Sequence, residues 1–338
     1  MSTEELKKNI EEPNNDDQAI DVVLRPQKWD EYVGQEQVKK NARVIIDAAR
    51  IRKEPVDHIL LYGQAGLGKT TLARLIAREM GATVKTTSGP AIEKVGDLAA
   101  ILSNLEEGEV LFIDEAHRLN KLIEEILYPA MESRKLNIVI GKGTGARTIS
   151  LDLPPFSLLA ATTRVNLLSA PLRSRFGATF RLEYYTQEDI EKIVKRSAKI
   201  LGIDIDADAA SVLAKASRNT PRVANRLLRR TRDYIAVKKH KRVTEGVAKE
   251  TLAFLDVDEL GLETHDRNFL KTIIEKFGGG PVGVKTIAAA IGEEAATIEE
   301  VYEPYLMKLG FIKRTPAGRV VELAAFEHLG LKPPRKLI

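Results

Sequence analysis

The sequence predicts an α/β fold in which a domain built on a parallel sheet is followed by two smaller, mainly helical units. Three observations lead to this prediction. Short apolar runs alternate with helical segments from residue 58 to residue 183, a pattern typical of a parallel sheet with helices on both faces. After Tyr184 the strand-like runs stop and helical periodicity begins. Beyond residue 264, helices precede a segment that reads as a β-hairpin.

The first region contains short apolar runs that indicate strands buried in a sheet. We expect them at His58–Tyr62, Val110–Ile113 and Leu158–Ala161, with a helix at Thr70–Met80. Between the last two runs, Asn137–Leu153 alternates in the manner of an inserted β-hairpin. Such a hairpin could dock a partner or form an ordinary sheet edge.

The second region has the periodicity of three helices, with Asp206 and Thr220 as their expected caps. The helices are expected at Gln187–Leu201, Ala207–Ser217 and Pro221–Lys238, and an acidic connector at Leu255–Leu262. The third region then has expected helices at Arg267–Phe277, Val284–Ile291 and Ala296–Leu309, and a hairpin at Phe311–Leu323. Helices followed by a hairpin predict a winged helix. We therefore expect a disordered tail at 1–20, a large domain at 21–184, a small helical domain at 185–256 and the winged helix at 257–338.

Composition excludes several kinds of site. The chain has no cysteine, which excludes disulfides, thiolate zinc sites and cysteine nucleophiles. It has no apolar run long enough to span a membrane, and its acidic first residues lack the apolar core of a secretory signal. We expect a cytoplasmic protein. The net charge is only +4, but basic residues outnumber acidic ones by 16 to 10 over 184–256 and by 7 to 2 over 305–338.

The most specific motif is a phosphate-binding loop. Gly63–Thr70 (GQAGLGKT) fits the pattern GxxxxGK[ST], and it lies between an expected strand and an expected helix. The glycines let backbone N–H groups surround phosphate oxygens, and the helix N-terminus adds a favourable dipole. Lys69 would neutralise phosphate charge, and the Thr70 hydroxyl would bind Mg²⁺. The expected nucleotide contacts of this segment are Gly63, Gly66, Leu67, Gly68, Lys69, Thr70 and Thr71.

Two further strand ends carry polar residues that suit phosphate chemistry. Asp114 and Glu115 end the expected strand at 110–113, at the edge where open α/β sheets bind ligands. We expect Asp114 to hold Mg²⁺ and Glu115 to orient the attacking water. Thr162 or Thr163, after the next strand, could contact the γ-phosphate or that water, or could simply cap the strand.

Arginines in three places could contact phosphates. Arg173 and Arg175 lie near the end of the large domain, where one of them could reach a γ-phosphate; for Arg173 a surface salt bridge is equally compatible. Arg222 begins a helix, where its charge opposes the helix dipole, and this favours a role at the nucleotide. Arg314 and Arg319 flank the expected wing tip, which is either a DNA contact or a solvated basic hairpin.

Taken in order, these segments resemble the RuvB family of bacterial Holliday-junction branch-migration motors, which are AAA+ ATPases. The resemblance covers residues 20 to 330, and its third-domain motifs are absent from clamp loaders. It rests on LRPQKWDEYVGQ (24–35), GLGKTTLA (66–73), LFIDEAHRL (111–119), ATTR (161–164), PLRSRFG (171–177), TPRVANRLLRR (220–230), GGGPVG (278–283) and GFIKRTPAGR (310–319).

The resemblance implies a homohexameric ring that uses ATP and Mg²⁺ to move duplex DNA at Holliday junctions, in recombination, repair and the SOS response. It implies RuvA as a partner that docks on the hairpin at 137–153, and the RuvC resolvase as a second partner. It assigns adenine recognition to Leu24, Arg25 and Tyr185, contact with a neighbouring subunit's nucleotide to Arg175, and the role of a second sensor to Arg222. It assigns Glu132, Ser133 and Arg134 to the subunit interface, and Arg314 and Arg319 to contacts with DNA.

The sequence departs from the family pattern at two places. Gln64-Ala65 stand where two prolines are usual, so the loop should be less rigid. Ala317 replaces an arginine of the wing, which should weaken non-specific DNA binding. Two alternatives to a DNA motor are a clamp-loader-type ATPase and an ATP-gated winged-helix regulator. The third domain argues against the first alternative, and the presence of Glu115 and Arg175 argues against the second.

Overall fold

The computed structural model describes residues 15–140 and 147–333. The chain divides into two compact units. One holds the described residues up to Ile193 together with Thr220–Arg222, and the other holds Val194–Asn219 and the described residues from Val223 onward. Among the described residues, every helix is too short or too polar to cross a membrane.

The first unit is built on a parallel sheet of five strands in the order β2-β3-β6-β1-β7, which confirms the predicted α/β class. Because β6 lies between β1 and β3, the ends of these three strands meet at one edge, where Tyr62 pairs with Thr162. The strands are β1 (Ile59–Tyr62), β2 (Val84–Ser88), β3 (Val110–Asp114), β6 (Ser157–Thr162) and β7 (Ala178–Arg181).

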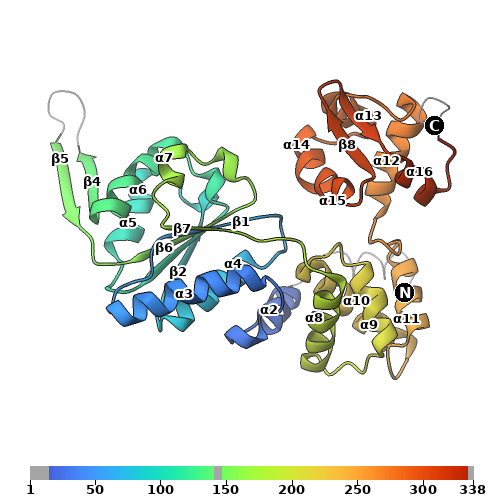
Figure 1. Cartoon of the computed structure of the whole chain (residues 1–338), viewed down its shortest axis with the longest axis horizontal. Coiled ribbons are helices and arrows are strands. Elements are labelled where there is room, and N and C mark those ends of the chain that lie inside the picture. The colour runs from blue at the N-terminus through green and yellow to red at the C-terminus, as the bar shows by residue number, and fades with distance from the viewer. Residues whose placement is uncertain (1–14, 141–146, 334–338) are drawn as a thin grey trace. The chain divides into compact units, whose positions relative to one another are not determined.

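Helices cover both faces of this sheet, with α3 and α4 on one side and α5, α6 and α7 on the other (Figure 1). The apolar core on the second side joins residues of β3 and β6 to α5 and α6, and it includes Leu98, Ile113, Ile123 and Leu158. The helices of this unit are α2 (Asn15–Leu24), α3 (Glu36–Arg52), α4 (Lys69–Glu79), α5 (Val95–Ser103), α6 (Lys121–Ser133) and α7 (Ala170–Arg173).

Two features of the first unit bear on the sequence-based expectations. The expected hairpin is present as β4 (Lys135–Ile140) and β5 (Arg147–Asp152), and it projects from the domain (Figure 1).

The expectation of a disordered tail over 1–20 is wrong at its end, because Asn15–Leu24 form α2. The rest of that tail, residues 1–14, lies outside the described residues.

The second unit contains a helical part and a winged-helix part. The helical part comprises most of α8 (Gln187–Ile200) and α10 (Pro221–Lys238), with α9 (Ala207–Lys215) and α11 (Glu245–Phe254). Asp206 occupies the cap position of α9, but its side chain makes no cap hydrogen bond and pairs with Arg242 instead. The winged-helix part comprises α12 (Thr264–Phe277), α13 (Val284–Ile291), α14 (Ala295–Thr297), α15 (Glu303–Lys308), β8 (Ile312–Thr315), β9 (Gly318–Val321) and α16 (Leu323–Leu329).

The single helix expected at Ala296–Leu309 is interrupted. A π-helical turn at Ile298–Tyr302 separates α14 from α15, and Pro304 lies in the first turn of α15. Proline has no backbone N–H, so an α-helix cannot pass through it with all its hydrogen bonds. The wider turn before Pro304 accommodates this break, and it points both Glu299 and Glu303 toward the β8–β9 hairpin.

Substituting the core of the winged helix tests this packing. Phe269 is fully buried and contacts Tyr302, with 5.9 Å between the ring centroids. We expect Phe269→Ala to lower the free energy of unfolding by about 3–5 kcal/mol, because the change leaves a cavity. Val301→Ala, at a side chain that is 53% exposed, should change it by less than about 0.5 kcal/mol. Denaturant unfolding measures both, and equal effects would contradict this core.

Candidate functional site

The phosphate loop connects β1 to α4, and its backbone geometry requires glycine. Gly63, Gly66 and Gly68 have φ values of 145°, 80° and 93°, a region that other residues rarely adopt. A Cβ on Gly63 would also lie 2.5 Å from the carbonyl oxygen of Leu182. The loop ends at the N-terminus of α4, where backbone N–H groups and the helix dipole favour an anion.

Lys69 is held inside this loop. Its side chain is buried, and the ammonium donates hydrogen bonds of 2.8 Å to the carbonyl oxygens of both Gly63 and Gln64. Burial lowers the pKa of Lys69 to about 8, although the nearby charge of Asp114 opposes the shift. A positive charge in such a poorly solvated position gains strongly from a phosphate.

Thr70 and Asp114 meet across the sheet edge. The Thr70 hydroxyl donates to Oδ2 of Asp114 at 2.9 Å, and the backbone N–H of Glu115 donates to Oδ1 at 2.9 Å. A hydroxyl beside a carboxylate provides the oxygen ligands that Mg²⁺ prefers, with room for water and phosphate oxygens as the others. The two residues fit the predicted metal site.

Glu115 and the two threonines differ in their surroundings. Glu115 has a φ of 49° and a half-exposed side chain, which pairs with Arg118 at 3.3 Å. Thr162 is buried at the end of β6, and its hydroxyl contacts Nδ1 of His117 at 3.0 Å. Thr163 is exposed. His117 was not among the residues predicted from the sequence, although its position two residues after the carboxylate pair was a usable signal.

Two of the three expected adenine contacts, Tyr185 and Arg25, lie near the same loop. The Tyr185 hydroxyl donates to the carbonyl of Leu67 at 3.2 Å, and burial raises the pKa of Tyr185 to about 12. Leu24 is buried. Burial, and after it the charge of Arg74, lowers the pKa of Arg25, with Asp21 and Asp114 opposing. Arg25 and Thr71 line one pocket of about 420 Å³ together with Arg74 and Arg78, neither of which was predicted from the sequence.

Arg222 lies beside the loop as well. It belongs to the same compact unit as the phosphate loop. A Cβ on Gly66 would lie 3.0 Å from the Cβ of Arg222 and 3.6 Å from that of Thr220. The side chain of Arg222 is exposed. The structure therefore brings the predicted second sensor next to the expected phosphates.

Arg175 forms a separate cluster at the end of α6. Its guanidinium pairs with Glu132 at 2.9 Å, donates to the carbonyl of Pro171 at 2.7 Å and lies 4.5 Å from the centroid of the Tyr128 ring. Ser133 donates to the carbonyl of Pro129, and Arg134 ends α6 with a φ of 54°. The structure thus places Arg175 beside Glu132, the first of the predicted interface residues 132–134. Arg173 is exposed.

The two wing arginines share a buried carboxylate. Glu303 is fully buried, and it accepts hydrogen bonds from Nε of Arg314 at 2.5 Å and from Nε of Arg319 at 2.7 Å. Arg319 also pairs with Glu299 at 2.9 Å, and its side chain is only 13% exposed, against 47% for Arg314. Arg314 is therefore the better placed of the two to reach a phosphate.

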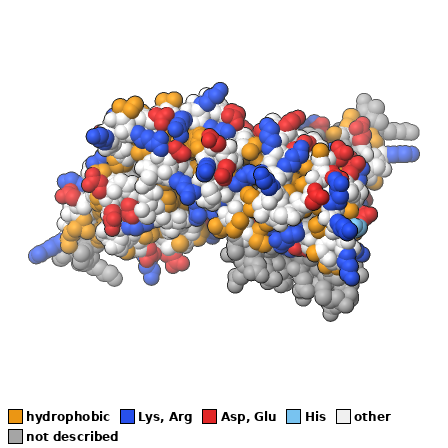
Figure 2. Space-filling view, turned by 90° about the horizontal axis from the view of Figure 1, so that it is seen from below, with side chains coloured by type: hydrophobic (Ala, Val, Ile, Leu, Met, Phe, Trp, Pro, Cys, Tyr) orange, Lys and Arg blue, Asp and Glu red, His pale blue; other side chains and the backbone are white. Residues whose placement is uncertain are grey.

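Basic and acidic side chains are mixed on the face of the molecule that Figure 2 displays. The wing follows the same pattern, because Lys313 pairs with Glu322 at 2.5 Å. The excess of basic residues at the C-terminal end is therefore partly neutralised by carboxylates in the folded protein.

Comparisons with known proteins agree along the chain. Models of the Holliday junction DNA helicase RuvB P-loop domain, the RuvB AAA lid domain and the RuvB C-terminal winged helix domain match residues 24–182, 185–258 and 259–330. The solved structure of the Thermotoga maritima RuvB Holliday junction branch migration motor is 48% identical, with a TM-score of 0.85, over 92% of this chain and 100% of that chain. A mutant of that protein matches at 48% identity and a TM-score of 0.86, over 92% and 99% of the two chains.

The pKa of Lys69 predicts how nucleotide affinity depends on pH. A bound phosphate favours the charged ammonium, so binding requires proton uptake once the pH exceeds the pKa of about 8 in the free protein. We expect the affinity for ADP to be level near pH 7.5 and to fall by up to about tenfold per pH unit above the pKa. Fluorescence titration with a labelled ADP measures it.

The matched control is Lys69→Arg, because arginine keeps its charge over this range. Its affinity, whatever its absolute value, should vary little between pH 7.5 and 9.5. A wild-type affinity that stays constant to pH 9.5 would show that the Lys69 ammonium is not the titrating phosphate ligand.

Proposed function

The chain belongs to the RuvB family of Holliday junction DNA helicases, and from this premise we propose that it is an ATP- and Mg²⁺-dependent motor that moves Holliday junctions along duplex DNA. Its enzyme class is that of the AAA+ ATPases. One observation carries the proposal: a complete phosphate loop with a paired Thr70 and Asp114 occurs in the same chain as a winged helix. A clamp-loader-type ATPase is not favoured, since the third domain is a winged helix.

ATP hydrolysis would be divided among residues at the sheet edge. Lys69 and the backbone N–H groups of the loop hold the β- and γ-phosphates. Thr70 and Asp114 would hold Mg²⁺, which when bound neutralises charge on the phosphate oxygens. Glu115 orients the attacking water and polarises its O–H bond. Thr162 or Thr163 contacts the γ-phosphate or that water.

Recognition of the rest of the nucleotide would fall on residues around the loop. Leu24 and Arg25 border the adenine from the N-terminal side, and Tyr185 fixes the carbonyl of Leu67 from the other. Arg222 reaches the phosphates and reports their presence to the helical domain. The proximity of Arg222 to Gly66 supports this role.

We further propose a homohexameric ring in which Arg175 acts on the nucleotide of a neighbouring subunit. Its pairing with Glu132, one of the proposed interface residues 132–134, supports this role. Its Nε is buried without a hydrogen-bond partner among the described residues. An unsatisfied buried donor is unfavourable, and a rearrangement of Arg175 toward a phosphate would satisfy it. An arginine acting in trans contributes about 10³–10⁵ to the hydrolysis rate.

Partners and domains follow from the same family relationship. We propose domains at 21–184, 185–256 and 257–338, a cytoplasmic location and a role in recombination, repair and the SOS response. RuvA would dock on the β4–β5 hairpin, where Ile149 and Leu151 are 43% and 41% exposed; residues 141–146 of this hairpin lie outside the described residues. RuvC would be a further partner at the junction. Duplex DNA would contact the wing through Arg314, with Arg319 as the second candidate.

Replacing the proposed water-orienting carboxylate tests the mechanism. Glu115→Gln should keep ATP affinity, because the phosphate ligands remain, and should lower turnover by about 100-fold or more. Branch migration of a four-way junction in the presence of RuvA should be lost in parallel. ATPase assays and gel-based migration assays measure these effects. Glu107→Gln, at an exposed carboxylate, is the control, and undiminished turnover in Glu115→Gln would refute the assignment.

The wing is tested by the salt dependence of DNA binding. Arg314→Ala should weaken binding to duplex DNA of any sequence and should reduce the slope of log affinity against log salt by about 1, since one phosphate contact is lost. Lys241→Ala removes the same charge from an exposed position of the helical domain and should leave the slope unchanged. Fluorescence anisotropy at several salt concentrations measures both, and an unchanged slope in Arg314→Ala removes this residue from the DNA interface.

A further inference from the structure

The turn that precedes the second sensor has an unusual backbone. Arg218 and Asn219 have φ values of 54° and 55°, a left-handed conformation that is unfavourable for a residue with a Cβ. Such conformations persist where the surroundings fix them. The next three residues, Thr220–Arg222, belong to the compact unit of the phosphate loop. This turn is therefore one of the two places where the chain joins the nucleotide sensor to the second unit, the other being the bond from Arg222 to Val223.

Both side chains of the turn are bound by the winged helix. The Arg218 guanidinium donates to the carbonyl of Gly261 at 2.8 Å, pairs with Asp266 of α12 and lies 5.5 Å from the centroid of the Tyr305 ring. Asn219 accepts a hydrogen bond of 2.5 Å from Lys308 of α15. The side chain of Arg218 is 14% exposed and that of Asp266 only 2%, so this is a buried ion pair.

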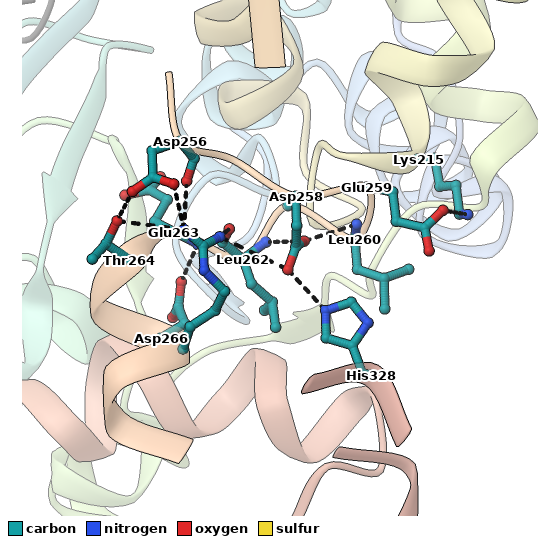
Figure 3. A network of polar contacts seen from close by, with 12 residues as sticks. Lys215, Asp256, Asp258, Glu259, Leu260, Leu262, Glu263, Thr264, Asp266 and His328 are labelled. Carbon is teal, nitrogen blue, oxygen red and sulfur yellow. Dashed lines mark hydrogen bonds and ion pairs between the residues drawn. The ribbon is translucent and has the colours of Figure 1, made fainter. Parts of the chain in front are cut away.

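Polar contacts hold the connector between the helical domain and the winged helix, as Figure 3 shows. The Asp258 carboxylate accepts hydrogen bonds from the backbone N–H groups of Leu260 and Leu262, and it contacts Nε2 of His328 at 2.8 Å. Gly261 lies directly against the turn and the residues before it, since a Cβ there would be 3.2 Å from Cγ of Arg218 and 2.2 Å from the carbonyl oxygen of Ala216. The connector therefore leaves the turn and the winged helix little freedom to move apart.

We infer that Arg218 is a positioning residue that couples the nucleotide sensor to the DNA-binding domain. The inference rests on the proposed DNA-motor function. When Arg222 moves on a change of nucleotide, the adjoining turn moves with it. Separating Arg218 from Asp266 would leave a buried charge without its partner, which is strongly unfavourable. The ion pair therefore makes the winged helix move together with the turn, so that a change at the nucleotide site displaces the DNA-binding domain.

The double variant Arg218→Gln/Asp266→Asn tests this coupling, because it removes both charges and leaves no uncompensated buried ion. We expect basal ATPase activity within about twofold of wild type, since neither residue belongs to the nucleotide site. Stimulation of the ATPase by linear duplex, and the base pairs migrated per ATP in a junction assay, should each fall by about fivefold or more, the size of a typical coupling between sites. Arg242→Gln, which removes the ion pair with Asp206 inside the helical domain, should change neither ratio.

Two outcomes overturn the inference. One is full duplex stimulation in the double variant, and the other is a parallel loss of basal activity, which is what a purely structural role produces. If thermal unfolding shows that the double variant does not fold, Arg218→Gln alone decides by the same criteria, because the glutamine amide can donate to the Asp266 carboxylate, which also keeps its hydrogen bond from the backbone N–H of Glu263. Failure of the unaltered protein to migrate junctions counts against the proposed function, whereas the linear-duplex measurement judges the coupling without a junction.

Discussion

The first unit is organised around the Lys69 ammonium, which is buried away from water inside a glycine-rich turn. Two carbonyl oxygens hold it in place of solvent. The strand order then determines what surrounds it, since β6 lies between the strand that leads into the loop and the strand that ends in Asp114. Thr70, Asp114 and Thr162 come from three separate stretches of sequence, yet the parallel sheet delivers them to one edge. The chemistry of the site is thus a consequence of topology as much as of the motif.

Features that depend on local sequence were predicted well. The limits of α10 and α13 agree with the expected Pro221–Lys238 and Val284–Ile291, because proline and glycine mark helix ends in ways that the sequence displays. Features that depend on a distant partner were not predicted. The sequence shows the excess of basic residues at the wing, but it does not show that the turn before Pro304 brings Glu303 under Arg314 and Arg319. It likewise gave no sign that Arg175 would pair with Glu132.

The wing shows why a count of charged residues is a weak guide to a nucleic-acid interface. A fully buried carboxylate needs cationic partners, so part of the positive charge of the hairpin serves Glu303 instead of a ligand. The exposed fraction of each guanidinium, which only the folded structure gives, separates the two roles. Arg319 anchors the hairpin to α15, and Arg314 remains half available to solvent.

The loop departs from its family at Gln64-Ala65, and the geometry explains why the departure can be tolerated. Position 64 serves Lys69 through its backbone carbonyl, which every residue possesses, and Ala65 is exposed. Backbone conformation restricts the choice at 63, 66 and 68 but leaves these two positions open. Because the chain has no cysteine, position 65 is also a natural place to attach a single thiol-linked spectroscopic probe. Because the backbone at position 65 accepts other residues, such a probe would report directly on how the loop binds phosphate.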